Sequence, residues 1–184
     1  MEPVYIVTSL HRSGSSMMMR CLEAGGLTPV HNPVAILLNQ VLHDYIPNPN
    51  GFYQYGKPIT KDFYENNKGK LVKVPISELK NLPEGNYKIL LLKRDPKEIR
   101  ASMLKWTPYS KSWGMSMTST FLYDEIISSI RPTISVDYSD VINNSADTFN
   151  HISEHFPISA QHAANKVDTE LYRLKLNNDA DTRI

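Results

Sequence analysis

The sequence predicts an α/β fold of three layers, in which a central parallel sheet of about four to five strands is flanked by helices. Short apolar segments with the composition of buried strands lie at residues 4–7, 70–75, 86–93 and 132–136. Segments with helical spacing separate them, and this alternation favours parallel pairing with right-handed crossovers. Polar turns follow the first and third of these strands. Because ligands of parallel sheets bind at the carboxyl ends of the strands, both turns are expected to face one crevice.

Each expected helix has its own local signals. Asn32 and Asp95 are suitable N-caps, and each precedes a proline, which is favoured in the first turn. Gly25 and Gly26 are typical of a helix end. We expect helices, in chain order, at residues 17–24, 32–45, from 95 onward, at 118–130 and at 140–156.

Length and composition indicate an ordinary globular protein. The 184 residues predict one domain over residues 1–175 and a polar tail at 176–184. The formal net charge of +1 gives no reason to expect a nucleic-acid or membrane partner. Cys21 is the single cysteine, which suits a reducing compartment, and we expect it in the core. With no secretory signal or apolar run of membrane-spanning length, we expect a cytoplasmic protein.

The turn at residues 9–16 has the features of an anion-binding loop. An apolar strand precedes it and a helix follows, so that successive backbone N–H groups and the positive end of the helix dipole face the same point. Gly14 allows a tight bend, Arg12 adds a permanent charge, and three serines add hydroxyl donors. Plain N-capping explains one serine but not this whole set, so a phosphate or sulfate group is the expected ligand.

This turn differs from the nucleotide-binding P-loop, whose pattern is GxxxxGK[ST]. Aligned with that pattern, Ser9 replaces the first glycine and Ser15 replaces the lysine, while the positive charge lies earlier, at Arg12. A kinase or NTPase without this lysine lacks the group that neutralises the outer phosphates. The sequence therefore predicts a P-loop-like fold with a different chemistry.

A second candidate anion site follows the strand at 86–93. Arg94 comes directly after this strand, and Ser102 lies eight residues later, in the next helix. An arginine fork and a hydroxyl so placed can hold one phosphate from two sides. The alternative is that Arg94 pairs with Asp95 or a surface acid and that Ser102 has no special role. Two separate anion sites suit a nucleotide with separate 3′ and 5′ anions better than a nucleoside triphosphate.

These two segments resemble the motifs of sulfotransferases that use 3′-phosphoadenosine 5′-phosphosulfate (PAPS). Residues 11–17, HRSGSSM, are similar to the 5′-phosphosulfate loop, often RSGT[ST] in bacterial and Golgi-type members, and Arg94 with Ser102 resembles the 3′-phosphate motif. Residues 50–54 are similar to an NPxGxxE segment, except that Gln54 replaces the acid, and residues 135–141 look like the V-x-Y-E-x-L segment. Nothing after Phe156 resembles the C-terminal RKGxxGxxK segment of cytosolic members.

The resemblance implies transfer of a sulfuryl group from PAPS to a small-molecule or glycan hydroxyl (or an amine), without a metal. It implies that PAPS is bound by His11, Arg12, Ser13, Gly14, Ser15, Ser16, Arg94 and Ser102. Arg12, Lys73 and His31 are the implied catalytic residues. Lys73 is placed near the catalytic histidine of cytosolic members, where a lysine can stabilise the transferred group or, with a lowered pKa, act as base.

Several of these residues also have an interpretation without a functional role. Lys73 can be a solvated lysine at a strand end, and His31 a capping or surface residue. His43, Tyr53 and Tyr55 are candidates for an acceptor pocket, although packing explains them equally well. Two other functions also remain open: a P-loop kinase or NTPase with Asp137 as a metal ligand, and a non-catalytic nucleotide-binding relative.

Overall fold

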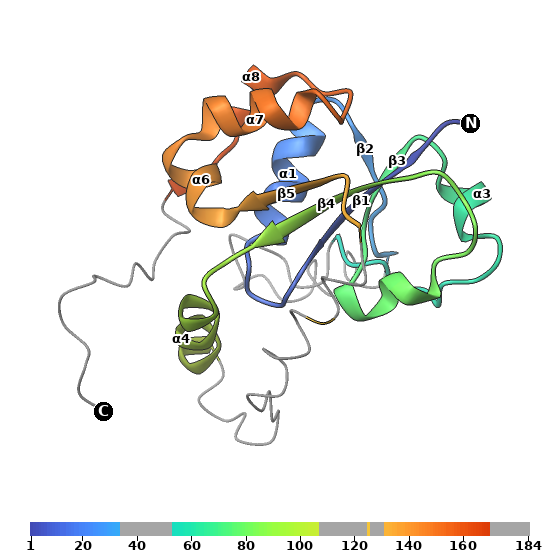
Figure 1. The fold of residues 1–184 in the computed structure, drawn as a ribbon, viewed down its shortest axis with the longest axis horizontal. Coiled ribbons are helices and arrows are strands. Elements are labelled where there is room, and N and C mark those ends of the chain that lie inside the picture. Colours follow the sequence, from blue (N-terminus) through green and yellow to red (C-terminus); the bar gives the residue numbers. More distant parts are fainter. Residues whose placement is uncertain (34–52, 107–124, 126–130, 170–184) are drawn as a thin grey trace.

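The computed structural model describes residues 1–33, 53–106, 125 and 131–169. Within these residues five parallel strands form one sheet in the order β2-β3-β1-β4-β5. The strands are β1 (Val4–Ser9), β2 (Thr28–Pro29), β3 (Lys70–Lys73), β4 (Tyr87–Lys93) and β5 (Ile134–Asp137). The predicted parallel sheet flanked by helices is confirmed (Figure 1).

Helices cover both faces of the sheet (Figure 1). They are α1 (Ser15–Ala24), α3 (Phe63–Asn67), the 3-10 helix η1 (Ile76–Asn81), α4 (Pro96–Trp106), α6 (Tyr138–Asn143), α7 (Ser145–Ser153) and α8 (Ala160–Ala164). Residues of α1, α6, α7 and α8 pack on one face, and residues of α3 and η1 pack on the other. None of the helices in the described ranges has the length and apolar character needed to span a membrane.

The central strand β1 alternates between these two layers. Val4 and Ile6 pack with α3 and η1, whereas Tyr5 and Val7 pack with α1 and α7. This alternation follows from the pleat of a strand, which turns successive side chains to opposite faces. β4 runs beside β1 from Val4↔Tyr87 to Ser9↔Leu92, and Leu90, Leu91 and Leu92 are buried, as predicted for a central strand.

The helix predicted from residue 95 onward is present as α4. Asp95 caps it, because the carboxylate oxygen Oδ1 accepts a hydrogen bond from the N–H of Lys97 at 2.7 Å. The single helix predicted at 140–156 is wrong: α6 ends at Asn143 and α7 begins at Ser145, and the φ of −133° at Asn144 between them is not helical. Asparagine and serine at 143–145 compete for backbone hydrogen bonds, which favours a break there. The helices predicted at 32–45 and 118–130 lie, apart from a few of their residues, outside the described residues.

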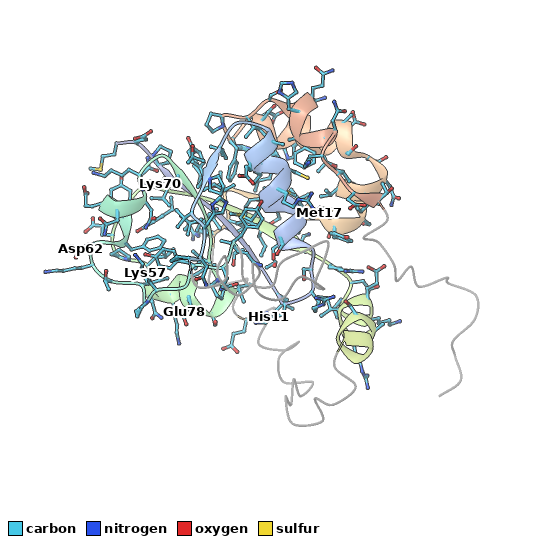
Figure 2. All side chains as sticks on the ribbon, turned by 180° about the vertical axis from the view of Figure 1, so that it is seen from behind. His11, Met17, Lys57, Asp62, Lys70 and Glu78 are labelled. Carbon is cyan, nitrogen blue, oxygen red and sulfur yellow. The ribbon has the colours of Figure 1, made fainter. Side chains whose placement is uncertain are left out.

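The parallel arrangement brings the ends of β1, β3 and β4 to one side of the sheet. His11 follows β1 and Lys70 begins β3, and the two lie at opposite ends of the sheet (Figure 2). Val74 follows β3, and its N–H donates to the carbonyl of Val7 at 3.1 Å, so that β3 ends beside the last residues of β1. The segments that follow these three strands therefore meet. They contain most of the residues that the sequence motifs predict to bind the anion.

Candidate active site

The loop after β1 presents a row of backbone donors. Gly14 is the N-cap of α1 with a φ of 85°, and its carbonyl accepts from the N–H of Met18 at 3.1 Å. Within the described part of the chain, the N–H groups of residues 13–17 have no acceptor. Together with the helix dipole, such a row of unsatisfied N–H groups forms an anion-binding site.

The backbone of this loop takes two left-handed conformations. Arg12 has a φ of 66° and Gly14 a φ of 85°. Gly14 also packs so closely on the ring of Tyr138 that an added Cβ would lie 2.1 Å from its Cε2. Both the positive φ and this contact require glycine at position 14. At Arg12 the same conformation costs on the order of 1 kcal/mol for a residue with a side chain.

Two hydroxyl groups near this loop are buried without a hydrogen-bond partner among the described residues. They are Ser13 Oγ and Thr8 Oγ1, and each residue is 1% exposed. A buried hydroxyl without a partner costs on the order of 1–3 kcal/mol. Ser13 lies in the row of free N–H groups, so an anion that accepts from its hydroxyl would recover this cost.

Arg12 connects the loop to the second predicted motif. Its side-chain Nε donates to Ser102 Oγ on α4 at 3.1 Å, and its carbonyl accepts from a terminal N–H of Arg94 at 3.0 Å. The two motifs are 82 and 90 residues apart in the chain, but they lie in direct contact. The structure thus brings Arg12, Arg94 and Ser102 together at the carboxyl end of the sheet.

Arg94 has two further contacts, one with an acid and one with an aromatic ring. Its Nε donates to Glu98 Oε2 at 2.8 Å, and both side chains are buried, at 7% and 10% exposed. Its guanidinium carbon lies 4.6 Å from the centre of the Tyr138 ring, a cation–π distance. The alternative of pairing with an acid is therefore partly realised, with Glu98 rather than with Asp95. The four-residue spacing from Arg94 to Glu98 was the available signal.

Lys73 lies at the end of β3 with its ammonium against the first turn of α1. Its Nζ donates to Ser16 Oγ at 3.1 Å. Burial lowers the pKa of Lys73 to about 8, because desolvation disfavours the charged form. No carboxylate of the described residues lies within ion-pair distance of this nitrogen. The interpretation of Lys73 as a solvated lysine is wrong.

His11 lies close enough to Lys73 for the positive charge of the lysine to affect its pKa. Burial, and then the positive charge of Lys73, lower the pKa of His11 from its ordinary value of 6.5. The imidazole is therefore neutral at pH 7 and can accept a proton. The loop and the adjoining end of β3 thus combine charged donors, from Arg12 and Lys73, with a neutral histidine.

His31 lies in a different cluster, near the last turn of α1. Its Nε2 is 3.8 Å from Glu23 Oε1, and its ring centre is 5.5 Å from that of Tyr53. The hydroxyl of Tyr53 donates to the other oxygen of Glu23 at 2.6 Å. Burial, and then this hydrogen bond, raise the pKa of Tyr53. These contacts place His31 beside Glu23 and Tyr53, at the end of α1 opposite to the one that the loop begins. Of the other acceptor candidates, His43 lies outside the described residues.

A cleft of about 350 Å³ opens beside the end of β3. Tyr55 borders it, and its N–H donates to the carbonyl of Lys73 at 3.1 Å. The full lining is Tyr55, Gly56, Lys57, Pro58, Ile59, Val74, Pro75 and Glu78. Its volume is within the range of small-molecule sites.

Comparisons with known proteins identify the fold of this chain but do not identify a reaction. No family model matches the chain, and no curated protein matches it significantly. Among solved structures, the sulfotransferase STF1 from Mycobacterium tuberculosis is similar, with a TM-score of 0.56 and 15% identity over 95% of this chain and 74% of that one. A sulfotransferase domain from the curacin biosynthetic pathway has a TM-score of 0.52 and 14% identity, over 93% of this chain and 77% of that one.

A sugar kinase from Janibacter is more distant, with a TM-score of 0.46 and 13% identity over 88% of this chain and 98% of that one. The two better matches show that this chain has a sulfotransferase-like α/β fold. At such low identity the likeness is one of fold alone.

Proposed function

We propose that this protein is a sulfotransferase that moves a sulfuryl group from PAPS to a hydroxyl or amine acceptor. The single observation that carries the proposal is the contact of Arg12 with both Arg94 and Ser102. It makes one continuous anion-binding surface from two motifs that are distant in the chain. The sulfotransferase-like fold supports the same conclusion.

The loop is proposed to bind the 5′ end of such a nucleotide. The hydroxyl of Ser13 and the N–H groups of residues 13–17, which have no acceptor among the described residues, would supply donors, and Arg12 and Lys73 would supply charge. Arg94 and Ser102 are proposed to hold the 3′-phosphate. A guanidinium has five N–H donors, so the bond from Arg94 to Glu98 leaves it able to bind phosphate as well.

PAPS would supply the sulfuryl group, and negative charge would develop on its leaving phosphate oxygen. Arg12 and the loop N–H groups are placed to stabilise that charge. Lys73 is proposed to act in its charged form, because an anion bound beside Ser16 raises the pKa of an ammonium group. That leaves His11, neutral at pH 7, as the proposed base for the acceptor hydroxyl.

The acceptor is proposed to be a small molecule or a glycan, bound in the cleft beside the end of β3. That cleft adjoins the Lys73 backbone and offers the phenol of Tyr55 together with one residue of each charge, Lys57 and Glu78. A mixed polar and apolar lining of this kind suits a hydroxyl compound of modest size.

The test compares nucleotides by thermal shift. PAP, the adenosine bisphosphate product, should raise the melting temperature, because a ligand of the folded state stabilises it. ATP with Mg²⁺ should have a smaller effect, and adenosine 5′-phosphate, which lacks the 3′-phosphate, should do less than PAP. Stabilisation by ATP-Mg²⁺ but not by PAP would overturn the proposal in favour of a kinase. Transfer of labelled sulfate from PAPS to a panel of hydroxyl acceptors then separates an enzyme from a binding protein.

A further inference from the structure

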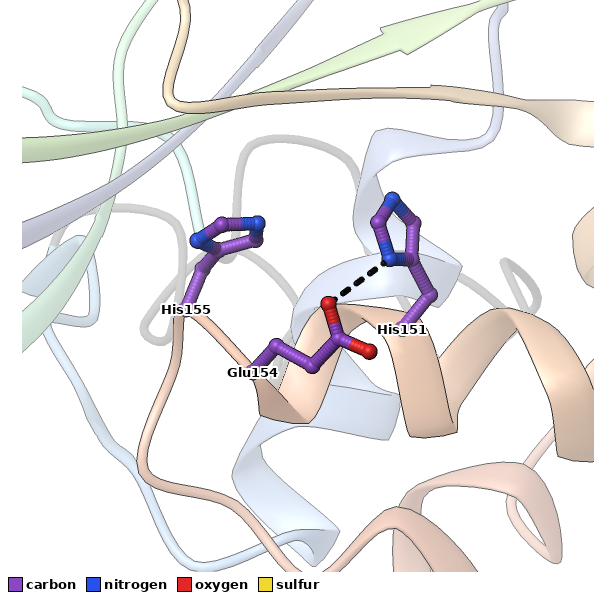
Figure 3. Close-up of side chains that lie close together, drawn as sticks. All are labelled: His151, Glu154 and His155. Atoms are coloured by element: carbon purple, nitrogen blue, oxygen red, sulfur yellow. Dashed lines mark hydrogen bonds and ion pairs between the residues drawn. The ribbon is translucent and has the colours of Figure 1, made fainter.

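Three potential metal ligands meet at the carboxyl end of α7. His151, Glu154 and His155 each offer one ligand atom, and these atoms all lie within 4.8 Å of one another. The carboxylate of Glu154 lies between the two imidazole rings, and its Oε2 is 3.2 Å from His151 Nδ1 (Figure 3). The centres of the two rings are 5.8 Å apart.

The register of α7 explains why these side chains share one side. Phe149 and Ile152 face the core, and Phe156, just beyond the helix, is buried with them. His151 and Glu154 lie on the opposite side, at 59% and 66% exposed. Residues three and four positions apart are neighbours on a helix, so His155 joins the same group.

We propose that His151, Glu154 and His155 form a binding site for a divalent transition-metal ion such as Zn²⁺. Imidazole nitrogen and carboxylate oxygen are ligands that zinc prefers. In a tetrahedral site with metal–ligand bonds of about 2.0–2.1 Å, ligand atoms lie roughly 3.3 Å apart. The present separations of up to 4.8 Å therefore need only small side-chain rotations. Water takes the fourth position.

This site lies away from the anion-binding loop. Phe156 follows His155 directly, and its ring packs 5.4 Å from that of Tyr5, near the start of β1. The loop follows the other end of that strand. The ion therefore takes no part in sulfuryl transfer, and the proposal does not depend on the proposed function.

The expected role of the ion is structural. It joins the last turn of α7 to the turn that leads to α8, and α8 packs on both α7 and α1. Fixing this connection holds Phe156 in the core. An ion that binds only the folded protein raises the melting temperature as its concentration rises.

The test is titration of the full chain, without a polyhistidine tag, with ZnCl₂ by calorimetry and thermal shift. One zinc ion per chain and a higher melting temperature are expected, with no effect from Mg²⁺ at the same concentration. The variants His151→Ala and Glu154→Gln should each weaken zinc binding at least about tenfold, because loss of a group that only hydrogen-bonds a metal ligand already costs about that much. His162→Ala, which removes another exposed histidine on α8, is the matched control and should bind zinc normally.

Because His151 and Glu154 are exposed, these variants should fold, and their melting temperatures without metal check this. A crystal soaked with zinc should give an anomalous peak among the three side chains. Absence of zinc binding, or equal weakening by His162→Ala, would overturn the proposal.

Discussion

Helix α1 has a polar, positively charged beginning and an apolar flank, and these two regions are built on opposite principles. On the flank, Met18, Met19 and Leu22 are fully buried with Phe149 and Phe156, and every group is apolar. At the beginning, Ser13 Oγ is buried with no hydrogen-bond partner among the described residues, Arg12 has a positive φ, and Lys73 is partly desolvated. The flank stabilises the fold, whereas the beginning keeps unfavourable features that a bound anion would relieve. Variants in the two regions should therefore change stability in opposite directions.

The largest effect is expected in the apolar region. Phe149→Ala should lower the free energy of unfolding by about 3–5 kcal/mol, because it removes a fully buried ring and leaves a cavity. Denaturant titration measures this loss. A loss below about 1 kcal/mol would show that this layer does not carry the stability assigned to it.

Lys73→Met should have the opposite sign, raising the free energy of unfolding at pH 7 by up to about 3 kcal/mol. In the folded chain the pKa of Lys73 is lowered to about 8 from 10.5, so the charged form is disfavoured by folding. The penalty is complete below pH 8 and disappears as the pH rises from about 8 towards 10.5. The difference between variant and parent should therefore shrink at pH 10.

The matched control for this prediction is Lys70→Met, which removes an exposed lysine at the start of the same strand and should not raise the free energy of unfolding at pH 7. The Lys73 variant should also lose sulfuryl transfer. A variant that is more stable and fully active would contradict the role proposed for Lys73.

Arg94→Ala should weaken PAP binding by about 2 kcal/mol or more, close to 30-fold, because a charge-assisted pair is lost. The affinity for adenosine 5′-phosphate should change less, since the 3′-phosphate is absent. Arg100→Ala, which removes an exposed arginine on α4, the helix that follows Arg94, is the control. Unchanged PAP affinity in the Arg94 variant would refute its assignment to the 3′-phosphate.

Ser13→Ala should have the smallest effect on stability. It should also change stability and PAP binding in opposite directions. Removal of a buried hydroxyl that no other described residue bonds should raise the free energy of unfolding by about 1 kcal/mol. The same change should weaken PAP binding, because the ligand loses a donor. Calorimetry and denaturant titration on one sample test both signs, and a destabilised variant would show that Ser13 already has a structural partner.

The sequence predicted the parts of the fold whose signals are local. The apolar runs of β1 and β4 and the cap at Asp95 are each readable within a few residues, and all three are present. β2 was missed because two residues are too few to show a pattern. The break at Asn144 was missed because apolar spacing continues across it.

For the site, sequence motifs selected Arg12, Arg94 and Ser102 but not their surroundings. Glu98 and Tyr138 matter because tertiary packing places a carboxylate and a ring against Arg94. The burial of Lys73 likewise depends on α1 covering the end of β3. No pattern along the chain shows such packing. The sequence alone therefore could not decide whether Lys73 is a site residue or a solvated lysine.

The residues that would hold the nucleotide come from the ends of β3, β1 and β4, which are adjacent in the sheet. A ligand bound there would couple the three strands to one another, because none can separate without breaking part of the site. Hydrogen–deuterium exchange should then slow in all three together when PAP is present. The two-residue edge strand β2 contributes nothing to the site, and its amides should exchange at the same rate with or without the ligand.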